Sequence, residues 1–270
     1  MAPPAATSDI ALPASPEYPL PEQKDPLASS TPVTNLFSLS SKTIAITGGG
    51  RGLGITFALA VLEAGGHPAC LDILESPSPV EWAHLTKLAA ARGQHVSYHR
   101  CDVTDEDATR AVLEDIDAAA QARGAPFGGT IACAGIQQKT ARILVERKRE
   151  GSVVLIASMS GQIANRGLTC SAYNTSKAAV QQMCRSLAQE WGQYGIRVNT
   201  LSPGYIRTAM TDELLAAEPE VEKTWMHGAM LNRLGVPEDF KAPAVFLLSE
   251  GSRFMTGADL RVDGGHCASA

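Results

Sequence analysis

The chain lacks the features of a membrane, metal-binding or nucleic-acid-binding protein. No apolar run approaches the roughly 20 residues that cross a bilayer. The six cysteines are scattered without a CxxC pair, which favours a reduced compartment and argues against a metal site. A net charge of −5 gives no reason to expect nucleic acid or an anionic membrane as a partner. We therefore expect a cytoplasmic protein that acts on small molecules.

Residues 1–36 lack arginine and an apolar core, so they match neither a mitochondrial presequence nor a secretory signal. Eight of the sixteen prolines lie before residue 33, mixed with alanine, serine and glutamate. This composition is typical of a disordered tail. Residues 37–270 show no composition shift after Ser41, and the chain is 44% hydrophobic, so we expect them to form one catalytic domain.

From Lys42 onward, short β-branched runs alternate with longer amphipathic stretches. The short runs predict strands at 42–47, 67–71, 94–101, 129–133, 152–156, 197–201 and 259–262. The longer stretches predict helices at 53–64, 80–92, 104–123 with Thr104 as N-cap, 173–191 and 237–248. Alternation of this kind, with nearly unbroken apolar strands, predicts an α/β fold with one doubly wound parallel sheet of the Rossmann type. Ligands of such sheets bind at the carboxyl ends of the strands.

A glycine-rich turn follows the first predicted strand and opens the first helix. It has the pattern GxxxGxG at Gly48, Gly52 and Gly54, which differs from the strict dinucleotide fingerprint GxGxxG. Its position matters more, because a helix N-terminus with free N–H groups favours phosphate. The turn predicts a pyrophosphate site; a glycine turn without a ligand is the alternative.

Carboxylates end the next two strands. Asp72 lies 18 residues after Gly54, where a dinucleotide fold places a carboxylate that binds ribose hydroxyls and repels a 2′-phosphate. It favours NAD over NADP, although Arg51 lies where it can reach a 2′-phosphate, and a loop-capping role for Asp72 stays open. Asp102 has two equal interpretations, an adenine contact or a cap of its own turn.

Tyr173 and Lys177 lie four residues apart, on one face of a predicted helix. A free phenol has a pKa of about 10, too high for a base near neutrality, whereas a nearby ammonium and an oxidised nicotinamide both favour the phenolate. Ser158 follows a neighbouring strand, so its hydroxyl can reach the same sheet edge and bind a substrate oxygen. These residues predict proton transfer to and from an alcohol or carbonyl.

The ordered set of motifs resembles the short-chain dehydrogenase/reductase family from about Leu36 to His266. The segments that carry the resemblance are 47–54, 101–103, 158–161, 173–177, 199–204 and 262–265. Segment 158–161 is most similar to fungal polyol and ketose members, such as the mannitol, arabinitol, sorbose and xylulose enzymes. The resemblance implies an oxidoreductase that transfers a hydride between NAD(P) and a secondary alcohol or ketone. It also implies a homo-oligomer, a dimer or tetramer.

The resemblance assigns catalysis to Ser158, Tyr173 and Lys177. Ser160 is the rival for the serine role, but Gly161 matches the family's SxxG spacing from Ser158. Candidate pocket residues in the stretch 209–234 are Met210, Trp225, Met226 and Met230, for which packing is an equal explanation. The cofactor contacts that the resemblance implies are Gly48, Arg51, Gly52, Leu53, Gly54, Asp72, Asp102, Val103, Ala134, Gly135, Tyr173, Lys177, Pro203, Gly204, Ile206 and Thr208.

Two departures from the family occur after the fourth strand. The family's Asn-Ala-Gly is Cys133-Ala-Gly135 here, and only residues 136–150 lead to the fifth strand. The family's crossover is usually about twice as long and carries a catalytic asparagine, which this segment lacks. We expect residues 140–150 to form a short helix that leaves apolar side chains on one flank of the sheet uncovered.

The short crossover leaves two interpretations open. One is an internally shortened form, from splicing or an error in the gene prediction, and the other is a tolerated deletion. The leading function is therefore an NAD(P)-dependent oxidoreductase of a polyol or sugar. The alternative is a catalytically impaired isoform of such an enzyme that still binds nucleotide.

Overall fold

The computed structural model describes residues 30–134, 139–217 and 219–269. Contacts group Val33–Ala270 into one compact unit, which begins with helix α1 (Val33–Leu36). The folded unit thus starts four residues before the predicted boundary. The predicted tail over residues 1–29 lies outside the described residues. None of the described helices has the length and apolar character needed to cross a membrane.

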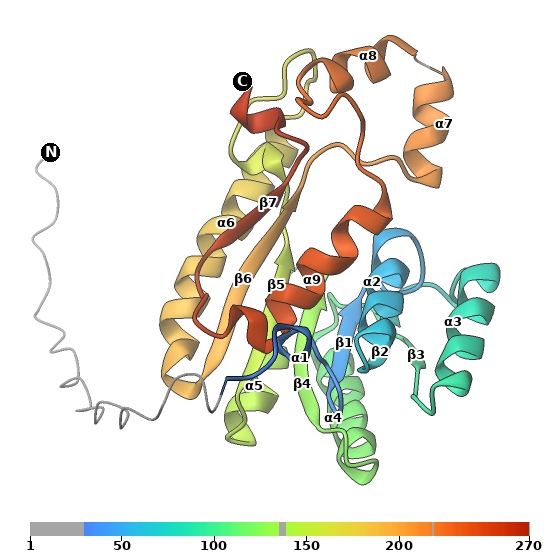
Figure 1. The fold of residues 1–270 in the computed structure, drawn as a ribbon, viewed down its shortest axis with the longest axis vertical. Helices are drawn as coiled ribbons and strands as arrows, with labels where there is room; N and C mark the ends of the chain where they lie inside the picture. The colour runs from blue at the N-terminus through green and yellow to red at the C-terminus, as the bar shows by residue number, and fades with distance from the viewer. Residues whose placement is uncertain (1–29, 135–138, 218, 270) are drawn as a thin grey trace, which may run out of the picture. The chain divides into compact units, whose positions relative to one another are not determined.

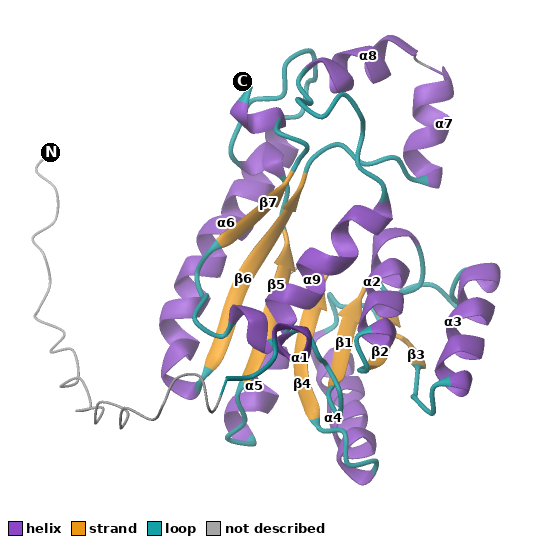
Figure 2. Cartoon of the chain, viewed as in Figure 1, coloured by secondary structure: helices purple, strands orange, loops and turns teal. Residues whose placement is uncertain are grey.

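In the part of the chain that the structure describes, seven parallel strands form one sheet (Figures 1 and 2). The spatial order is β3-β2-β1-β4-β5-β6-β7. Successive strands are added on one side of β1 as far as β3 and on its other side from β4 onward, so the order of addition switches between β1 and β4. This confirms the predicted doubly wound sheet. The strands are β1 Thr43–Thr47, β2 His67–Asp72, β3 Ser97–Arg100, β4 Phe127–Ala132, β5 Gly151–Ile156, β6 Ile196–Pro203 and β7 Asp259–Val262.

Helices cover both faces of the sheet because its strands are apolar on both sides. Ile44 and Ile46 of β1 pack with α2, α3 and α9, whereas Ala45 faces the layer of α4, α5 and α6. Helices α7 and α8 lie beyond the carboxyl end of the sheet (Figure 1). The helices on the two faces and beyond the sheet are α2 Gly52–Glu63, α3 Pro79–Ala91, α4 Glu106–Ala122, α5 Lys139–Glu146, α6 Ser171–Trp191, α7 Ala209–Ala217, α8 Pro219–His227 and α9 Lys241–Leu248.

Two local predictions differ from the structure. The N-cap of α4 is Asp105, whose carboxylate accepts from two backbone N–H groups, while Thr104 donates its hydroxyl to Asp102. Strand β3 begins at Ser97, later than predicted, because Gln94 instead caps the end of α2 through its side-chain amide. Helices α7 and α8 fall in the stretch 209–234, whose shape the sequence pattern does not predict.

The short crossover closes the sheet without breaking its register. Gly129 of β4 still pairs with Ser152 of β5. Helix α5 spans eight residues and ends at Glu146, before the predicted Glu150, because the backbone turns left-handed at Lys148 (φ 51°). The turn brings Arg147 and Arg149 onto Asp117 of α4.

The expectation of uncovered apolar side chains on this flank is wrong for the described residues. Helix α5 places Leu144 in the core, and α4 and α6 close over the rest. The side chains concerned are each no more than 4% exposed: Leu113, Ile116, Leu144, Val153, Leu155 and Leu187. The eight residues of α5 are therefore enough to fill the layer between α4 and α6 over strands β4 and β5.

Asp117 fastens the short helix to its neighbour. Its fully buried carboxylate accepts from Arg149 Nη1 at 2.6 Å, Arg147 Nε at 3.2 Å and Gln121 Nε2 at 2.8 Å. Removal of the Asp117 carboxylate leaves Gln121 and the partly buried Arg149 without their acceptor, at a cost of about 2 kcal/mol. We predict that Asp117→Ala lowers the free energy of unfolding by about that amount in urea titrations.

Glu114→Ala is the matched control, because Glu114 is exposed on the same helix. An Asp117→Ala protein as stable as the control would show that α5 is held by apolar packing alone.

Candidate active site

The predicted site residues converge at the carboxyl ends of the strands. Asp72 ends β2, Ser158 follows β5, and Gly204 follows β6. The switch point between β1 and β4 opens at the same edge, next to the glycine turn. In open α/β sheets ligands bind at this point.

The glycine turn has the geometry of a phosphate cradle. Gly48 and Gly52 adopt left-handed φ values of 66° and 55°. A Cβ on Gly54 would lie 2.0 Å from the carbonyl oxygen of Gly48, so only glycine lets the helix start this close to the turn. The first backbone bond of α2 runs from Ile55 N–H to the carbonyl of Arg51, which leaves the N–H groups of Gly52, Leu53 and Gly54 ahead of it. The residues present fit a dinucleotide pyrophosphate.

Asp72 and Asp102 both bind their own loops. The Asp72 carboxylate accepts from Gly50 N–H at 2.9 Å and from Leu74 N–H at 3.2 Å, so it supports the glycine turn. Asp102 Oδ1 accepts from the backbone N–H and the hydroxyl of Thr104, which lowers the pKa of Asp102. Each oxygen has a second lone pair, so these caps and a ribose or adenine contact are compatible.

Tyr173 and Lys177 lie at the start of α6. The Tyr173 side chain is 50% exposed, and the Lys177 ammonium lies 5.7 Å from the centre of its ring. Lys177 Nζ donates to the carbonyl of Ile156 at 3.0 Å. Burial lowers the pKa of Lys177, and the neighbouring Cys133 opposes this shift. The Lys177 ammonium therefore lies over the Tyr173 ring.

Ser158 presents its hydroxyl with one side already engaged. Its Oγ accepts from Ser160 N–H at 3.1 Å, so the hydroxyl proton remains available to a ligand oxygen. Ser160 is equally buried, within the one-turn 3₁₀ helix η1 (Met159–Gly161). This geometry favours Ser158 for the serine role, because Ser160 supports it through its backbone.

Cys133 occupies the position of the asparagine in the Asn-Ala-Gly motif of the family that the sequence resembles. Its thiol lies near Lys177. Burial raises the pKa of its thiol to about 12, against the opposing effect of Lys177. The thiol is therefore neutral at physiological pH and leaves the lysine charge unpaired by this neighbour. Its backbone N–H still donates to Thr47 at 3.2 Å, so β4 keeps its connection to β1.

The other predicted cofactor residues border the same edge. Gly204 follows β6, and a Cβ there would lie 2.7 Å from Asp263 Cα. Ile206 pairs with Gly235 in an isolated bridge, and Thr208 binds Thr211 at the start of α7. Ala134 N–H donates to the Thr47 hydroxyl at 3.2 Å. Arg51 is exposed, Val103 is half-buried in the turn after β3, Pro203 ends β6, and Gly135 lies outside the described residues.

A cavity of about 980 Å³ lies between the 163–167 loop, α8 and the C-terminal segment. Tyr205 lines it, stacks on Trp225 at 4.4 Å and accepts from Asn165 Nδ2 at 2.8 Å. His266 also lines it, and its Nδ1 is buried without a partner among the described residues. The sequence did not single out these residues, although Tyr205 and His266 directly follow the motifs at 199–204 and 262–265.

The candidate pocket residues in the stretch 209–234 have mixed outcomes. Trp225 and Met226 pack with Leu215 and Leu234, which supports the packing explanation for both. Met230 is 61% exposed. The side chain of Met210 is among those that the structure does not describe.

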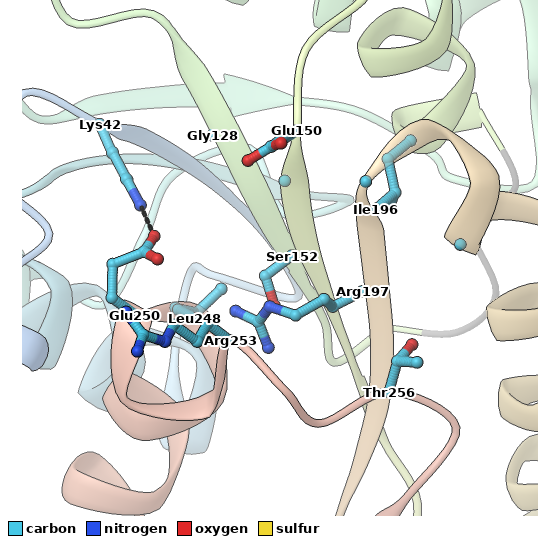
Figure 3. Close-up of a pocket in the computed structure, with 13 residues that line it drawn as sticks. Lys42, Gly128, Glu150, Ser152, Ile196, Arg197, Leu248, Glu250, Arg253 and Thr256 are labelled. Atoms are coloured by element: carbon cyan, nitrogen blue, oxygen red, sulfur yellow. Dashed lines mark hydrogen bonds and ion pairs between the residues drawn. The ribbon is translucent and has the colours of Figure 1, made fainter. Parts of the chain in front are cut away.

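A second cavity, of about 550 Å³, lies at the opposite edge of the sheet (Figure 3). Arg197, second residue of β6, donates there to Ser252 Oγ at 2.8 Å and to the Ser249 carbonyl at 3.1 Å. Lys42 pairs with Glu250 at 3.2 Å. These charges hold the end of α9 against the amino ends of the strands, so this cavity is structural.

Comparison with known proteins identifies the fold and the motifs together. The family model described as short chain dehydrogenase matches residues 42–144, and that described as Enoyl-(Acyl carrier protein) reductase matches residues 127–266. A short chain dehydrogenases/reductase of Aspergillus versicolor is 42% identical over 280 residues, which cover 92% of this chain and 94% of that protein. The chain belongs to the short-chain dehydrogenase/reductase family.

Further relatives agree with this short-chain dehydrogenase/reductase assignment. The D-arabinitol 2-dehydrogenase (ribulose-forming) of Scheffersomyces stipitis is 32% identical over 265 residues, covering 85% of this chain and 95% of that protein. The crystal structure of NADPH-dependent 3-quinuclidinone reductase from Rhodotorula rubra has a TM-score of 0.76 and 30% identity, over 93% of this chain and 100% of that one. The chain is thus an NAD(P)-dependent oxidoreductase by family.

The close approach at Gly54 gives a direct test of the cradle in this short-chain dehydrogenase/reductase. We predict that Gly54→Ala weakens NADH binding at least tenfold, about 1.4 kcal/mol, because the turn must open to admit the methyl group. Titration of NADH fluorescence measures it. Gly192→Ala is the control, since a Cβ at Gly192 meets nothing within 4 Å. Equal affinity in both variants would place the dinucleotide elsewhere.

Proposed function

We propose that this protein oxidises a secondary alcohol of a polyol, and reduces the corresponding ketose, with NAD(H). The observation that carries the proposal is the convergence of Tyr173, Lys177 and Ser158 beside the glycine turn at one sheet edge. The polyol class rests on the D-arabinitol relative.

The proposed mechanism assigns one task to each side chain. The Ser158 hydroxyl donates to the substrate oxygen and fixes the carbinol carbon. The phenol oxygen of Tyr173 takes the hydroxyl proton during oxidation and returns it during reduction. The positive charge of the Lys177 ammonium, which lies over the ring, stabilises the phenolate. Bound NAD⁺ supplies the hydride acceptor, so the balanced reaction is alcohol plus NAD⁺ to ketone plus NADH and H⁺.

The function is tested by a substrate panel with both cofactors. We expect NADH to form with at least one of D-arabinitol, mannitol, sorbitol and xylitol, and to be consumed with sorbose, xylulose or ribulose. Absorbance at the nicotinamide band follows both directions. NADH binding without turnover on any member of the panel would count against the polyol proposal.

Tyr173 should carry the proton transfer. We predict that Tyr173→Phe leaves NADH affinity within about twofold and lowers kcat by about 10²–10⁴-fold, since only the phenol oxygen is removed. Steady-state rates measure kcat, and NADH fluorescence titrations measure the affinity. Ser160→Ala is the control, expected to keep turnover. Unchanged turnover in Tyr173→Phe refutes the mechanism.

Asp72 should set the preference for NADH over NADPH. Its buried carboxylate would repel a 2′-phosphate, although exposed Arg51 would attract one. We predict that Asp72→Asn, which keeps one acceptor for the loop N–H groups, shifts the ratio of NADH to NADPH affinity at least tenfold toward NADPH. Fluorescence titrations with both cofactors measure the ratio. Tenfold tighter NADPH binding by the unmodified protein would reverse the assignment.

A catalytically impaired nucleotide-binding isoform is the second candidate function, and the short crossover favours it. The Aspergillus alignment runs over 280 positions, but 92% of this 270-residue chain is only about 248 residues. About 30 positions of that alignment thus have no counterpart here. The two family matches overlap at residues 127–144, which include residues 136–144 of the crossover. We infer that the missing positions belong to this segment.

A version with a family-length crossover separates the two candidates. If the short crossover impairs the enzyme, the restored version should gain turnover, melt at a higher temperature with NADH and form a more uniform oligomer. The same polyol panel, thermal melts and a sizing column measure these properties on both forms. Equal results would mean that the shortening is tolerated and that the impaired-isoform candidate fails.

The proposal includes a homo-oligomer and a cytoplasmic location. Family resemblance supports the oligomer, and the fully exposed Phe254 is a side chain that a second copy can cover. Six unpaired cysteines fit a reducing compartment. The sizing column of the crossover comparison also tests the oligomer.

A further inference from the structure

Helix α6 carries a third polar side chain one turn after Lys177. Tyr173, Lys177 and Gln181 are spaced four residues apart, so they lie along one face of the helix. Gln181 is only 6% exposed. Its Nε2 donates to the backbone carbonyl of Ser158 at 3.1 Å and to Ser202 Oγ at 3.1 Å. A buried amide with both protons engaged has a fixed orientation.

Lys177 and Gln181 together hold the end of β5. Lys177 donates to the carbonyl of Ile156, and Gln181 to that of Ser158, two residues further along the chain. Alternate carbonyls of an extended chain point the same way, which matches side chains one helical turn apart. Two consecutive turns of α6 are thus bonded to the segment that ends in the proposed catalytic serine.

The half-buried carboxylate of Asp259 orients the Gln181 amide from the other side, through Ser202. Ser202 Oγ donates to Asp259 Oδ1 of β7, so its lone pairs face the Gln181 N–H. The same carboxylate accepts from Thr200 Oγ1 and from Gln162 Nε2. The chain of donors therefore runs from Gln181 through Ser202 to Asp259. With one N–H committed to Ser202, the other points at Ser158.

The turn after Ser158 leaves little freedom to compensate for loss of this bond. A Cβ on Gly161 would lie 2.8 Å from the backbone of Lys177 and 2.9 Å from Gln181 Oε1, so η1 lies directly on α6. The Ser158 carbonyl accepts from the Gly161 N–H at 3.0 Å as well as from Gln181. The Ser160 N–H donates to the Oγ of Ser158. Movement of the carbonyl therefore moves the hydroxyl as well.

We propose that Gln181 is a positioning residue that sets the Ser158 hydroxyl against the substrate oxygen. The inference rests on the proposed function through the role of Ser158. Gln181 touches neither the reacting atoms nor the glycine turn in this arrangement. Its loss should leave NADH binding intact and displace only the serine. A displacement of about 1 Å can cost up to about a hundredfold in rate.

The test compares Gln181→Met, which keeps the length but has no donor, with Gln182→Met. Gln182 is exposed on the same helix, and its side chain accepts from Arg185. We expect Gln181→Met to lower kcat by about ten- to a hundredfold, with KM and NADH affinity within about twofold, and Gln182→Met to change none of them. Amide hydrogen exchange over residues 157–163 should quicken at least severalfold in Gln181→Met alone.

A double-mutant cycle with Ser158→Ala separates positioning from general stability. If Gln181 acts through the serine, Gln181→Met should cost little further turnover in the Ser158→Ala background. An equal loss in both backgrounds would overturn the proposal. Gln181→Leu is the second variant in case the methionine variant does not fold; it also lacks both donors and adds no charge to the buried site.

Hydrogen exchange keeps this test distinct from that of the proposed function. Unchanged exchange over residues 157–163 would overturn the positioning role whether or not the protein turns over a polyol. Suppose that exchange is faster in Gln181→Met but the unmodified protein oxidises no substrate. This result would support the bond from Gln181 to the Ser158 segment and would refute the proposed function.

Discussion

The bonds from α6 to the end of β5 are the constraint on which the site depends. They join the helix that carries the phenol and the ammonium to the strand that delivers the serine. The sheet itself sets only where strands end, to within the freedom of the loops that follow. Hydrogen bonds to two alternate carbonyls fix the distance and the rotation between helix and loop. The proposed proton transfer needs both, because its partners come from segments that are separate in the chain.

The same constraint explains how the fold accommodates a short crossover. The family's longer segment would add a wall and a side-chain amide near the lysine, but it is not what joins α6 to β5. Asp117 with its two arginines holds the remaining helix, and apolar side chains from α4 and α6 fill the layer. The short crossover therefore leaves the sheet and its helices packed. What it removes is the segment in which the family carries a catalytic asparagine, so it bears on catalysis and not on the fold.

The sequence predicted the parts that periodicity and spacing control. Apolar runs located each strand to within a few residues, and the motif order located Ser158, Tyr173, Lys177 and Gly54 at one edge. It failed where a single side chain decides between neighbours, as with Asp105 and Thr104 at the α4 cap. Gln181 was out of reach because its partners, Ser158 and Ser202, are distant in the chain and lie in no pattern that involves it. Helices α7 and α8 depend on the stacking of Trp225 on Tyr205, another long-range contact.

The most direct test of the account follows the hydride itself. The unmodified protein is incubated with NAD⁺ and D-arabinitol deuterated at its carbinol carbons, and the cofactor product is examined by mass spectrometry. The account predicts NADH that carries one deuterium per molecule, formed in equal amount to the ketose. Tight NADH binding by the protein, with no label transferred from this polyol or from the other members of the panel, would contradict it.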